Sequence, residues 1–359
     1  MSFTFTTRLP LSRQAVDRDH LTRGLPDLFD QLWADAATRV LPVWHGKILL
    51  APHDAASTDP ASIDPASIDP ASIDPASIDP ASTEPASIDP ASIGVHLALL
   101  PPTSLHNAGL RVYLGRSLPA DLPETAGTRI VAVQLDDDAA VRLEPDESRW
   151  VGLRTVATVL DDRDAGLFTE ALGVLNWHAS HGHCPRCGAA TLVEEGGWVR
   201  RCPVDNSQVF PRTDPAVIVL ITDADDRILL GSNAMWENNR YSLLAGFVEP
   251  GEALETAVIR EMFEESGLRV TDPVYVGSQP WPFPASVMCG FTARLAHDQA
   301  AHELLPDGAE ILALRWFSRK DLLDAGEWML LPGPSSIAHA MIERWLGAPL
   351  PAATELIRP

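Results

Sequence analysis

Residues 246–268 read GFVEPGEALETAVIREMFEESGL, and this stretch decides the fold of the C-terminal half of the chain. A glycine-rich turn leads into a helix, and Gly267 is placed where a helix C-cap is expected. One face of the helix is apolar and can pack inward. Another face carries like charges three and four residues apart, which is unfavourable on a free helix. This acidic face consists of Glu261, Glu264 and Glu265.

Such a face becomes favourable when divalent cations occupy it. Hard cations such as Mg²⁺ and Mn²⁺ bind carboxylate oxygens and bridge substrate phosphates. They also polarise a phosphoryl oxygen and help to deprotonate an attacking water. Arg260 can hold neighbouring carboxylates through a bidentate pair. The sequence therefore predicts a metal site on this helix, and the alternative is a solvated acidic surface.

The spacing of the fixed residues in this stretch resembles the Nudix box. The positions that match are Gly246, Glu252, Arg260, Glu261, Met262, Glu264, Glu265, Gly267 and Leu268. The chain thus resembles Nudix hydrolases over about residues 213–345. That resemblance implies an enzyme that cleaves nucleoside diphosphates linked to another moiety.

A second stretch, SQPWPFPAS at 278–286, begins 11 residues after Gly267. Its prolines stiffen a backbone that carries two aromatic rings, which could clamp a flat ring or form a buried turn. The stretch resembles the SQPWPFPxS signature of the NAD(H) diphosphatase subfamily. This implies hydrolysis of the central pyrophosphate of NADH or NAD⁺ to nicotinamide mononucleotide (reduced or oxidised) and AMP. The same bond is cut when NAD caps are removed from RNA 5′ ends.

The resemblance also implies roles for individual residues. Glu261, Glu265 and Glu310 would bind the catalytic metals together with the Ala245 carbonyl, and the general base stays open between Glu264 and Glu310. Glu252 would organise the loop before the helix. A homodimer would complete the site. The implied substrate-binding residues are Phe210, Phe247, Gln279, Pro280, Trp281, Pro282, Phe283, Pro284, Ala285, Ser286 and, through its backbone, Ala338.

Three of the four cysteines lie within 19 residues in CPRCGAATLVEEGGWVRRCPVD, residues 184–205. The resemblance implies a structural zinc ribbon here, but the fourth cysteine is missing. Zinc also accepts carboxylate oxygen, so Asp205 can complete a set with Cys184, Cys187 and Cys202. His181 or His183 could serve instead, or the ribbon binds no zinc. Cys289 is expected to be a buried free thiol.

Seven five-residue units fill residues 59–93, DPASI in five of them, within a repeat loop at 57–93. Proline at every fifth position forbids a helix and disrupts a central strand. The runs VLPVWHGKILLAP before the loop and GVHLALLPP after it both indicate strands. The repeat is therefore predicted to be an extended strand-to-strand loop, and the alternative is a β-solenoid.

Further strand-like runs occupy 110–115, 128–135 and 149–156, and helical spacing is found at 166–182. We expect an α+β protein in which a strand-rich domain (1–165) and a connecting helix with a zinc-ribbon-like segment (166–212) precede a Nudix domain (213–359). The Nudix fold is a mixed sheet sandwiched by helices.

The composition narrows the function classes. A net charge of −22, from 27 basic and 49 acidic residues, argues against a surface that binds nucleic acid through its phosphates. RNA is therefore expected only as an NAD-capped substrate. No apolar run long enough to span a membrane exists, and the cysteine pattern without a signal peptide predicts a cytoplasmic protein. The alternatives are a Nudix enzyme for another nucleotide such as ADP-ribose or coenzyme A, and a non-enzymatic nucleotide-binding regulator.

Overall fold

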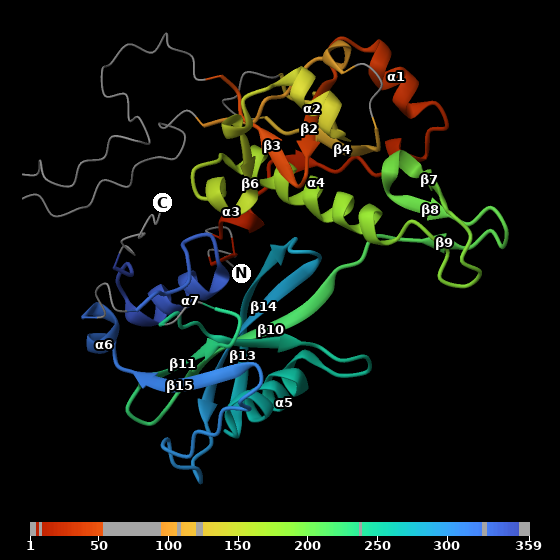
Figure 1. Cartoon of the computed structure of the whole chain (residues 1–359). Helices are drawn as coiled ribbons and strands as arrows, with labels where there is room; N and C mark the ends of the chain where they lie inside the picture. The colour runs from red at the N-terminus through yellow and green to blue at the C-terminus, as the bar shows by residue number, and fades with distance from the viewer. Residues whose placement is uncertain are drawn as a thin grey trace, which may run out of the picture.

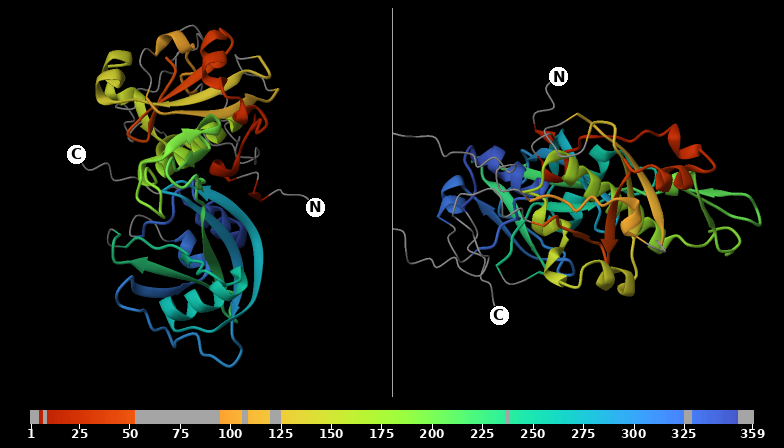
Figure 2. Two further views of the ribbon diagram at one scale, coloured as in Figure 1. Left: turned by 90° about the vertical axis from the view of Figure 1, so that its right-hand side faces the viewer. Right: turned by 90° about the horizontal axis from the view of Figure 1, so that it is seen from above.

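The structure is a computed structural model that describes residues 5–6, 9–52, 95–105, 109–119, 125–236, 239–324 and 329–351. Two sheet-based bodies lie at opposite ends of the molecule, and the long helix α4 (Asp162–Ser180) runs between them (Figures 1 and 2). A small three-stranded sheet follows α4 on one side.

The N-terminal body is a six-stranded sheet in the order β1-β4-β5-β2-β3-β6. Successive side chains along its strands point to opposite faces of the sheet. One face packs on α4, and the other packs on the short helices α1 and α2. The bounds are β1 Val16–Asp17, α1 Leu28–Ala34, β2 Arg39–Trp44, β3 Lys47–Leu49, β4 Arg111–Ser117, β5 Arg129–Gln134, α2 Asp137–Leu143, β6 Trp150–Gly152 and α3 Leu153–Val156, with single 3₁₀ turns at Pro10–Ser12, Thr22–Gly24, Pro102–Ser104 and Glu147–Arg149.

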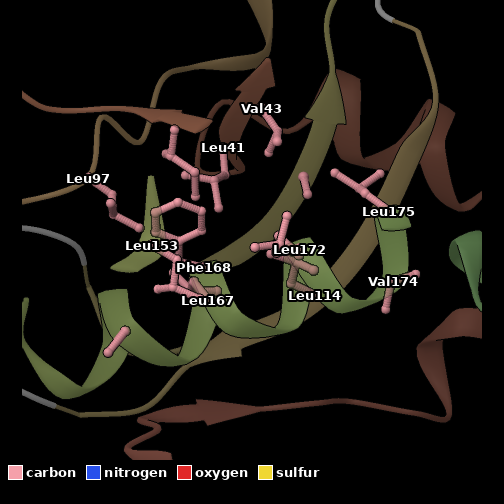
Figure 3. Close-up of a cluster of buried hydrophobic side chains, with 14 of the residues drawn as sticks. Leu41, Val43, Leu97, Leu114, Leu153, Leu167, Phe168, Leu172, Val174 and Leu175 are labelled. Atoms are coloured by element: carbon pink, nitrogen blue, oxygen red, sulfur yellow. The ribbon is translucent and has the colours of Figure 1, made fainter. Parts of the chain in front are cut away.

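Helix α4 supplies the largest share of the N-terminal core. Leu167, Phe168 and Leu172 on the helix meet Leu41 and Leu114 on the sheet (Figure 3). The helix begins four residues earlier than predicted because the Asp161 side chain accepts a hydrogen bond from the Asp164 N–H and caps it.

After α4 the chain forms the small antiparallel sheet of β7 (Leu192–Glu194), β8 (Val199–Arg201) and β9 (Gln208–Val209), with a 3₁₀ turn at Glu195–Gly197. The predicted metal-binding cysteines lie in two turns: Cys184 and Cys187 in the turn before β7, and Cys202 in the connection between β8 and β9. Trp198 fastens this sheet to the N-terminal body, since its indole N–H donates to the Tyr113 carbonyl at 2.8 Å.

The C-terminal body is a mixed sheet in the order β13-β14-β10-β11-β15, with β12 also paired to β10. Successive residues of β10 point to opposite faces, one covered by α5 and the other by α7. This is the predicted mixed sheet between helices. The bounds are β10 Asp214–Thr222, β11 Ile228–Asn233, β12 Leu244–Phe247, α5 Leu254–Ser266, β13 Val270–Trp281, β14 Ser286–Leu295, β15 Ile311–Phe317, α6 Arg319–Leu323 and α7 Ile337–Leu346.

The local predictions for this body agree with the structure. Helix α5 spans the acidic stretch and ends at Gly267, whose φ of 70° is the left-handed conformation expected of a C-cap. Helix α7 begins after Ser336, whose side chain accepts a hydrogen bond from the His339 N–H and caps the helix.

Two strand predictions in the N-terminal half are wrong in extent. The 149–156 run is a strand only at Trp150–Gly152 and then turns into α3. The run after the repeat forms only isolated bridges, Leu50 to Leu97 and Val40 to Leu100. Both runs are apolar because they are buried, and burial alone does not separate a strand from irregular chain. The repeat itself lies outside the described residues.

Candidate active site on helix α5

Arg260 is the centre of an ion-pair network on α5. Its guanidinium donates to the Glu252 carboxylate with two contacts of 2.8 Å, to Glu261 at 2.9 Å and to Glu264 at 2.8 Å. It also donates to the Phe247 carbonyl at 3.0 Å. The hydrogen bonds from Arg260 lower the pKa of Glu252 to about 2. Arg260, through Glu252 and the Phe247 carbonyl, therefore ties the loop before the helix to the acidic face.

Glu261 reaches the loop through the space that Gly246 leaves open. A Cβ on Gly246 would lie 2.0 Å from the Glu261 carboxyl carbon, so any larger residue would displace the carboxylate. Burial raises the pKa of Glu261, against the stabilising contacts from Arg260. Position 246 thus requires a glycine, because the Glu261 carboxylate of the acidic face occupies the space of a side chain.

Glu265 is the most buried member of the group, 5% exposed, and its Oε2 atom has no hydrogen-bond partner among the described residues. Burial and the negative charges of Glu261, Glu310 and Asp307 raise its pKa to about 8, and a backbone contact with Ala245 opposes this. A buried carboxylate oxygen that faces other carboxylates requires a proton or a cation. Hard divalent cations prefer such oxygens, so the residues present fit a metal.

Glu310 comes to this site from the turn before β15. The Asp307 carboxylate accepts hydrogen bonds from the N–H groups of Ala309, Glu310 and Ile311 at 2.8–3.0 Å and holds that turn. Asn233 donates to Glu310 at 3.4 Å from β11. Asp307 is not among the site residues predicted from the sequence, although the Asp-Gly pair at 307–308 is a turn signal.

The SQPWPFPAS stretch lies at the junction with the N-terminal body. Gln279 is fully buried and tethers α7, since it donates to the Ser335 carbonyl at 3.0 Å and accepts from the Ile337 N–H at 2.7 Å. Asn176 of α4 donates to the Pro282 and Pro284 carbonyls at 2.9 and 3.1 Å. These side-chain amides therefore tie the stretch to α4 and α7, and the Ser12 hydroxyl also donates to the Ser278 carbonyl at 3.0 Å.

The two rings of the stretch pack edge to face, with the Trp281 and Phe283 centroids 5.0 Å apart. The Arg154 guanidinium lies over Phe283 at 4.1 Å, and both rings border the N-terminal core. Among the other predicted substrate residues, Phe210 and Phe247 are exposed. Ala338 is buried in α7, and Ala245 pairs with Ile218 of β10. The structure thus brings Ala245, Phe247, Glu252, Arg260, Glu261, Glu264, Glu265 and Glu310 to one region and places the remaining residues elsewhere.

The four predicted zinc ligands of residues 184–205 lie close together. Ligand atoms of Cys184, Cys187, Cys202 and Asp205 all lie within 4.8 Å of one another. The Cys187 and Cys202 sulfurs are 3.4 Å apart, and Cys184 Sγ is 3.6 Å from Asp205 Oδ2. Zinc–sulfur bonds of about 2.3 Å in a tetrahedron require separations of roughly 3.8 Å, so this set fits zinc. Hydrogen bonds lower the pKa of the Cys184 thiol to about 7, and the one with Ser207 has the largest effect. The lowered pKa favours the thiolate.

Three family models match the chain in succession. The NADH pyrophosphatase-like rudimentary NUDIX domain covers residues 37–177, the NADH pyrophosphatase zinc ribbon domain covers 179–210, and the NUDIX domain covers 212–335. The sheet and the acidic helix α5 thus define a Nudix domain. With the two preceding matches, the chain belongs to the Nudix family and has the domain set of the NADH pyrophosphatases.

The curated relatives agree with this assignment. The chain is 43% identical over 205 residues to the NAD-capped RNA hydrolase NudC of Mycobacterium bovis (strain BCG / Pasteur 1173P2), which covers 54% of this chain and 64% of the relative. It is 37% identical over 201 residues to human NAD-capped RNA hydrolase NUDT12, covering 52% of this chain and 43% of the relative. The chain therefore spans less than two thirds of the length of these relatives. A crystal structure of a NUDIX hydrolase from Nitrosomonas europaea aligns over 47% of this chain and 94% of its own, at 23% identity and a TM-score of 0.38.

Proposed function

We propose that this protein hydrolyses the pyrophosphate bond of NADH or NAD⁺ and releases nicotinamide mononucleotide, reduced or oxidised, and AMP. The observation that carries the proposal is the unpartnered buried Oε2 of Glu265, which faces the charges of Glu261 and Glu310. Such a group of carboxylates is stable near neutral pH when divalent cations balance it. Bound Mg²⁺ or Mn²⁺ would polarise the phosphoryl oxygens and acidify the attacking water.

The chain's own residues prepare this site. Glu261 and Glu265 would hold the metals with Glu310 and the Ala245 carbonyl, while Arg260 fixes the direction of the Glu261 carboxylate. Two carboxylates are candidates for the proton acceptor from the attacking water. Glu264 has a 57% exposed side chain and a single ion-pair partner in Arg260, whereas Glu310 is held in a turn. Glu264 and Glu310 therefore both stay candidates for the general base.

The same proposal assigns residues to substrate binding. The residues at 279–286, with Phe210, Phe247 and the Ala338 backbone, would position the dinucleotide, and a second copy of the chain would complete the site as a homodimer. We also propose the three-part division at residues 165 and 212 and a cytoplasmic location. The part of the chain that the structure describes has no helix long and apolar enough to cross a membrane.

NAD-capped RNA is the second candidate substrate. The printed names of the relatives favour it, and the chemistry at the pyrophosphate would be identical. The chain carries 49 acidic and 27 basic residues, which disfavours tight binding of a polyanion. We therefore rank the free dinucleotide first. A comparison of both substrates at several salt concentrations separates them, because RNA affinity depends strongly on salt.

A structural zinc bound by Cys184, Cys187, Cys202 and Asp205 completes the proposal. The distances among these four ligand atoms support Asp205 as the fourth ligand. No histidine joins the group within the described residues. The ion would stabilise the ribbon between the two bodies and take no part in the hydrolysis.

Glu261→Gln and Glu265→Gln test the proposed activity. Each removes one charge and keeps the shape of the side chain, so we expect turnover of NADH with Mn²⁺ to fall by roughly two orders of magnitude or more. Glu255→Gln, an exposed change on the same helix, is the matched control and should keep wild-type turnover. Product identification must show nicotinamide mononucleotide and AMP. Near-normal turnover in both site variants at saturating metal would refute the assignment.

A further inference from the structure

The hairpin that joins β13 to β14 ends in a tip with few backbone donors of its own. The tip is the segment PFPA, residues 282–285, which lies beyond the last pair of the two-stranded ladder. Its two prolines have no N–H group. The Phe283 N–H donates back to the Trp281 carbonyl at 2.7 Å, outside the tip. The carbonyl groups of the tip therefore depend on donors from other parts of the chain.

Asn176 supplies two of these donors. Its side-chain nitrogen donates to the Pro282 carbonyl at 2.9 Å and to the Pro284 carbonyl at 3.1 Å. An amide nitrogen carries two N–H groups, so this side chain uses both of them on the tip. The Asp214 N–H donates to the Ala285 carbonyl at 2.8 Å. Three of the four carbonyls of the tip are thus bonded, two of them by Asn176.

Asn176 reaches the tip from the N-terminal side of the molecule, near the end of α4, the helix that runs between the two bodies (Figure 1). Its neighbours Leu175 and Trp177 are buried in the N-terminal core. One residue further, the His178 ring contacts the Gly197 carbonyl of the small sheet at 2.8 Å. The backbone that carries Asn176 is therefore fixed by two other parts of the fold and gives the tip a rigid support.

The tip belongs to the stretch that is proposed to position the dinucleotide, residues 279–286. The Trp281 and Phe283 rings of this stretch pack against the N-terminal core, so its placement depends on contact with the N-terminal body. A protein whose binding-competent conformation is only partly populated binds its ligand more weakly, in proportion to that population. Loss of the Asn176 hydrogen bonds would lower the population and weaken substrate binding. The α5 carboxylates would keep their geometry once substrate is bound.

We propose that Asn176 is a positioning residue for substrate binding, because it holds the hairpin tip in the conformation that receives the dinucleotide. The N-terminal body thereby takes part in substrate recognition by the Nudix domain. Asn176 acts through the tip, since its side-chain N–H groups are used on the Pro282 and Pro284 carbonyls. The inference rests on the proposed function, which supplies the ligand, NADH or NAD⁺.

Steady-state hydrolysis of NADH with Mn²⁺ by the full chain tests this proposal. Asn176→Ala and Asn176→Asp both remove the N–H donors, and the second keeps the size of the side chain. We expect KM to rise at least about fivefold in both variants, while kcat stays within about twofold of wild type because the bound complex is unchanged. Ser180→Ala is the matched control, since it removes a donor of the same helix that bonds to the Asn176 and Trp177 carbonyls within α4. It should keep both constants.

Hydrogen exchange followed by mass spectrometry gives a second readout that needs no activity. Peptides that cover residues 279–286 should exchange slowly in the wild-type chain and at least about fivefold faster in both Asn176 variants, because the tip opens more often. Peptides from α5 should keep their wild-type rates. Thermal melting checks that each variant folds.

Unchanged KM in both Asn176 variants would overturn the proposal. A wild-type KM in Asn176→Asp alone would also overturn it, because the donors would then be unnecessary, and so would a loss of kcat with KM unchanged. Rapid exchange of the tip in the wild-type chain would do so without any variant. A wild-type chain that does not hydrolyse NADH refutes the proposed function instead, and the exchange rates then decide alone whether Asn176 holds the tip.

Discussion

Single residues of the Nudix box have steric roles as well as chemical ones. Gly246 has no Cβ, and the Glu261 carboxylate occupies the position where that atom would lie. Arg260 donates a hydrogen bond to the same carboxylate at 2.9 Å. The direction of the Glu261 carboxylate is therefore set by a glycine and an arginine 14 residues apart.

We predict that Gly246→Ala reduces turnover by at least tenfold while α5 and the fold are kept, because the new methyl group displaces the Glu261 carboxylate from its position. Turnover with Mn²⁺ and far-ultraviolet circular dichroism measure the two effects. Gly24→Ala is the control, since a Cβ there meets nothing within 4 Å. Normal turnover in Gly246→Ala would contradict the steric role.

We predict that the buried His178 makes the free energy of unfolding depend on pH. Its ring is buried between the Gly197 carbonyl and the Arg200 guanidinium, each 2.8 Å away, and burial lowers its pKa to about 4. The unfolded chain binds a proton near pH 6.5 and the folded chain only near pH 4. The contribution of His178 to stability is therefore full above pH 6.5 and is lost as the pH falls toward 4.

Comparison with His178→Gln isolates this contribution. The difference in unfolding free energy, wild type minus variant, should fall by up to about 1.4 kcal/mol per pH unit between pH 6.5 and 4. Denaturant titrations at several pH values measure it. A difference that stays constant with pH would show that His178 does not titrate as proposed.

At the scale of elements, the zinc-ribbon segment links α4 to β10. Its sheet has only eight strand residues, in three strands of three, three and two. Such a small sheet has little core, so a bound metal would supply much of its stability. The cluster of three cysteines and Asp205 joins the turn before β7 to the connection between β8 and β9.

We predict about one zinc per chain beyond the catalytic metals. Asp205→Cys should hold the zinc more tightly, because four thiolates form a common structural site. Asp205→Ala should weaken zinc binding and lower the melting temperature, with catalysis affected only through the fold. Elemental analysis of protein purified without chelator provides the measurement. Fully folded, active protein without zinc would end this interpretation and leave a ribbon stabilised by packing.

At the scale of the whole molecule, the repeat is inserted where two segments of the N-terminal sheet already meet. The Ala51 N–H donates to the His96 carbonyl at 2.9 Å, and Leu50 bridges to Leu97. The chain thus leaves the sheet and returns to it at neighbouring points. The entropy of closing such a loop rises only slowly with its length.

We predict that the repeat is dispensable. Deleting residues 59–93 and joining the flanks with a short Gly/Ser turn should leave folding and NADH hydrolysis largely intact, as judged by melting temperature and turnover. A second variant with a Gly/Ser segment of the original length separates the effect of length from that of sequence. Loss of soluble protein in both variants would show that the repeat is structural.

The sequence by itself determined most of the Nudix domain. Helix α5, its Gly267 cap and the strands around it follow from local periodicity and turn chemistry, which depend on residues close together in the chain. The box residues were identified because their spacing places them on one helix and the loop before it. The cysteine spacing likewise pointed to a metal site, and the family resemblance implied that it is a zinc ribbon. The extents of the strands at 94–102 and 149–156 were less predictable, because buried irregular chain is as apolar as a strand.

Only the tertiary structure decided which distant groups meet. The approach of Gly246 to Glu261, the Asp307 turn that presents Glu310, and the amide of Gln279 as a tether for α7 all join residues through space. A cavity of about 380 Å³, bordered by Glu170 of α4, is the clearest case, since its walls come from segments more than 250 residues apart, from Thr6 to Val287. The burial of Glu170 could not be predicted from local sequence, because it depends on neighbours that are distant in the chain. Burial and long-range contact are products of the whole fold, and local spacing carries no record of them.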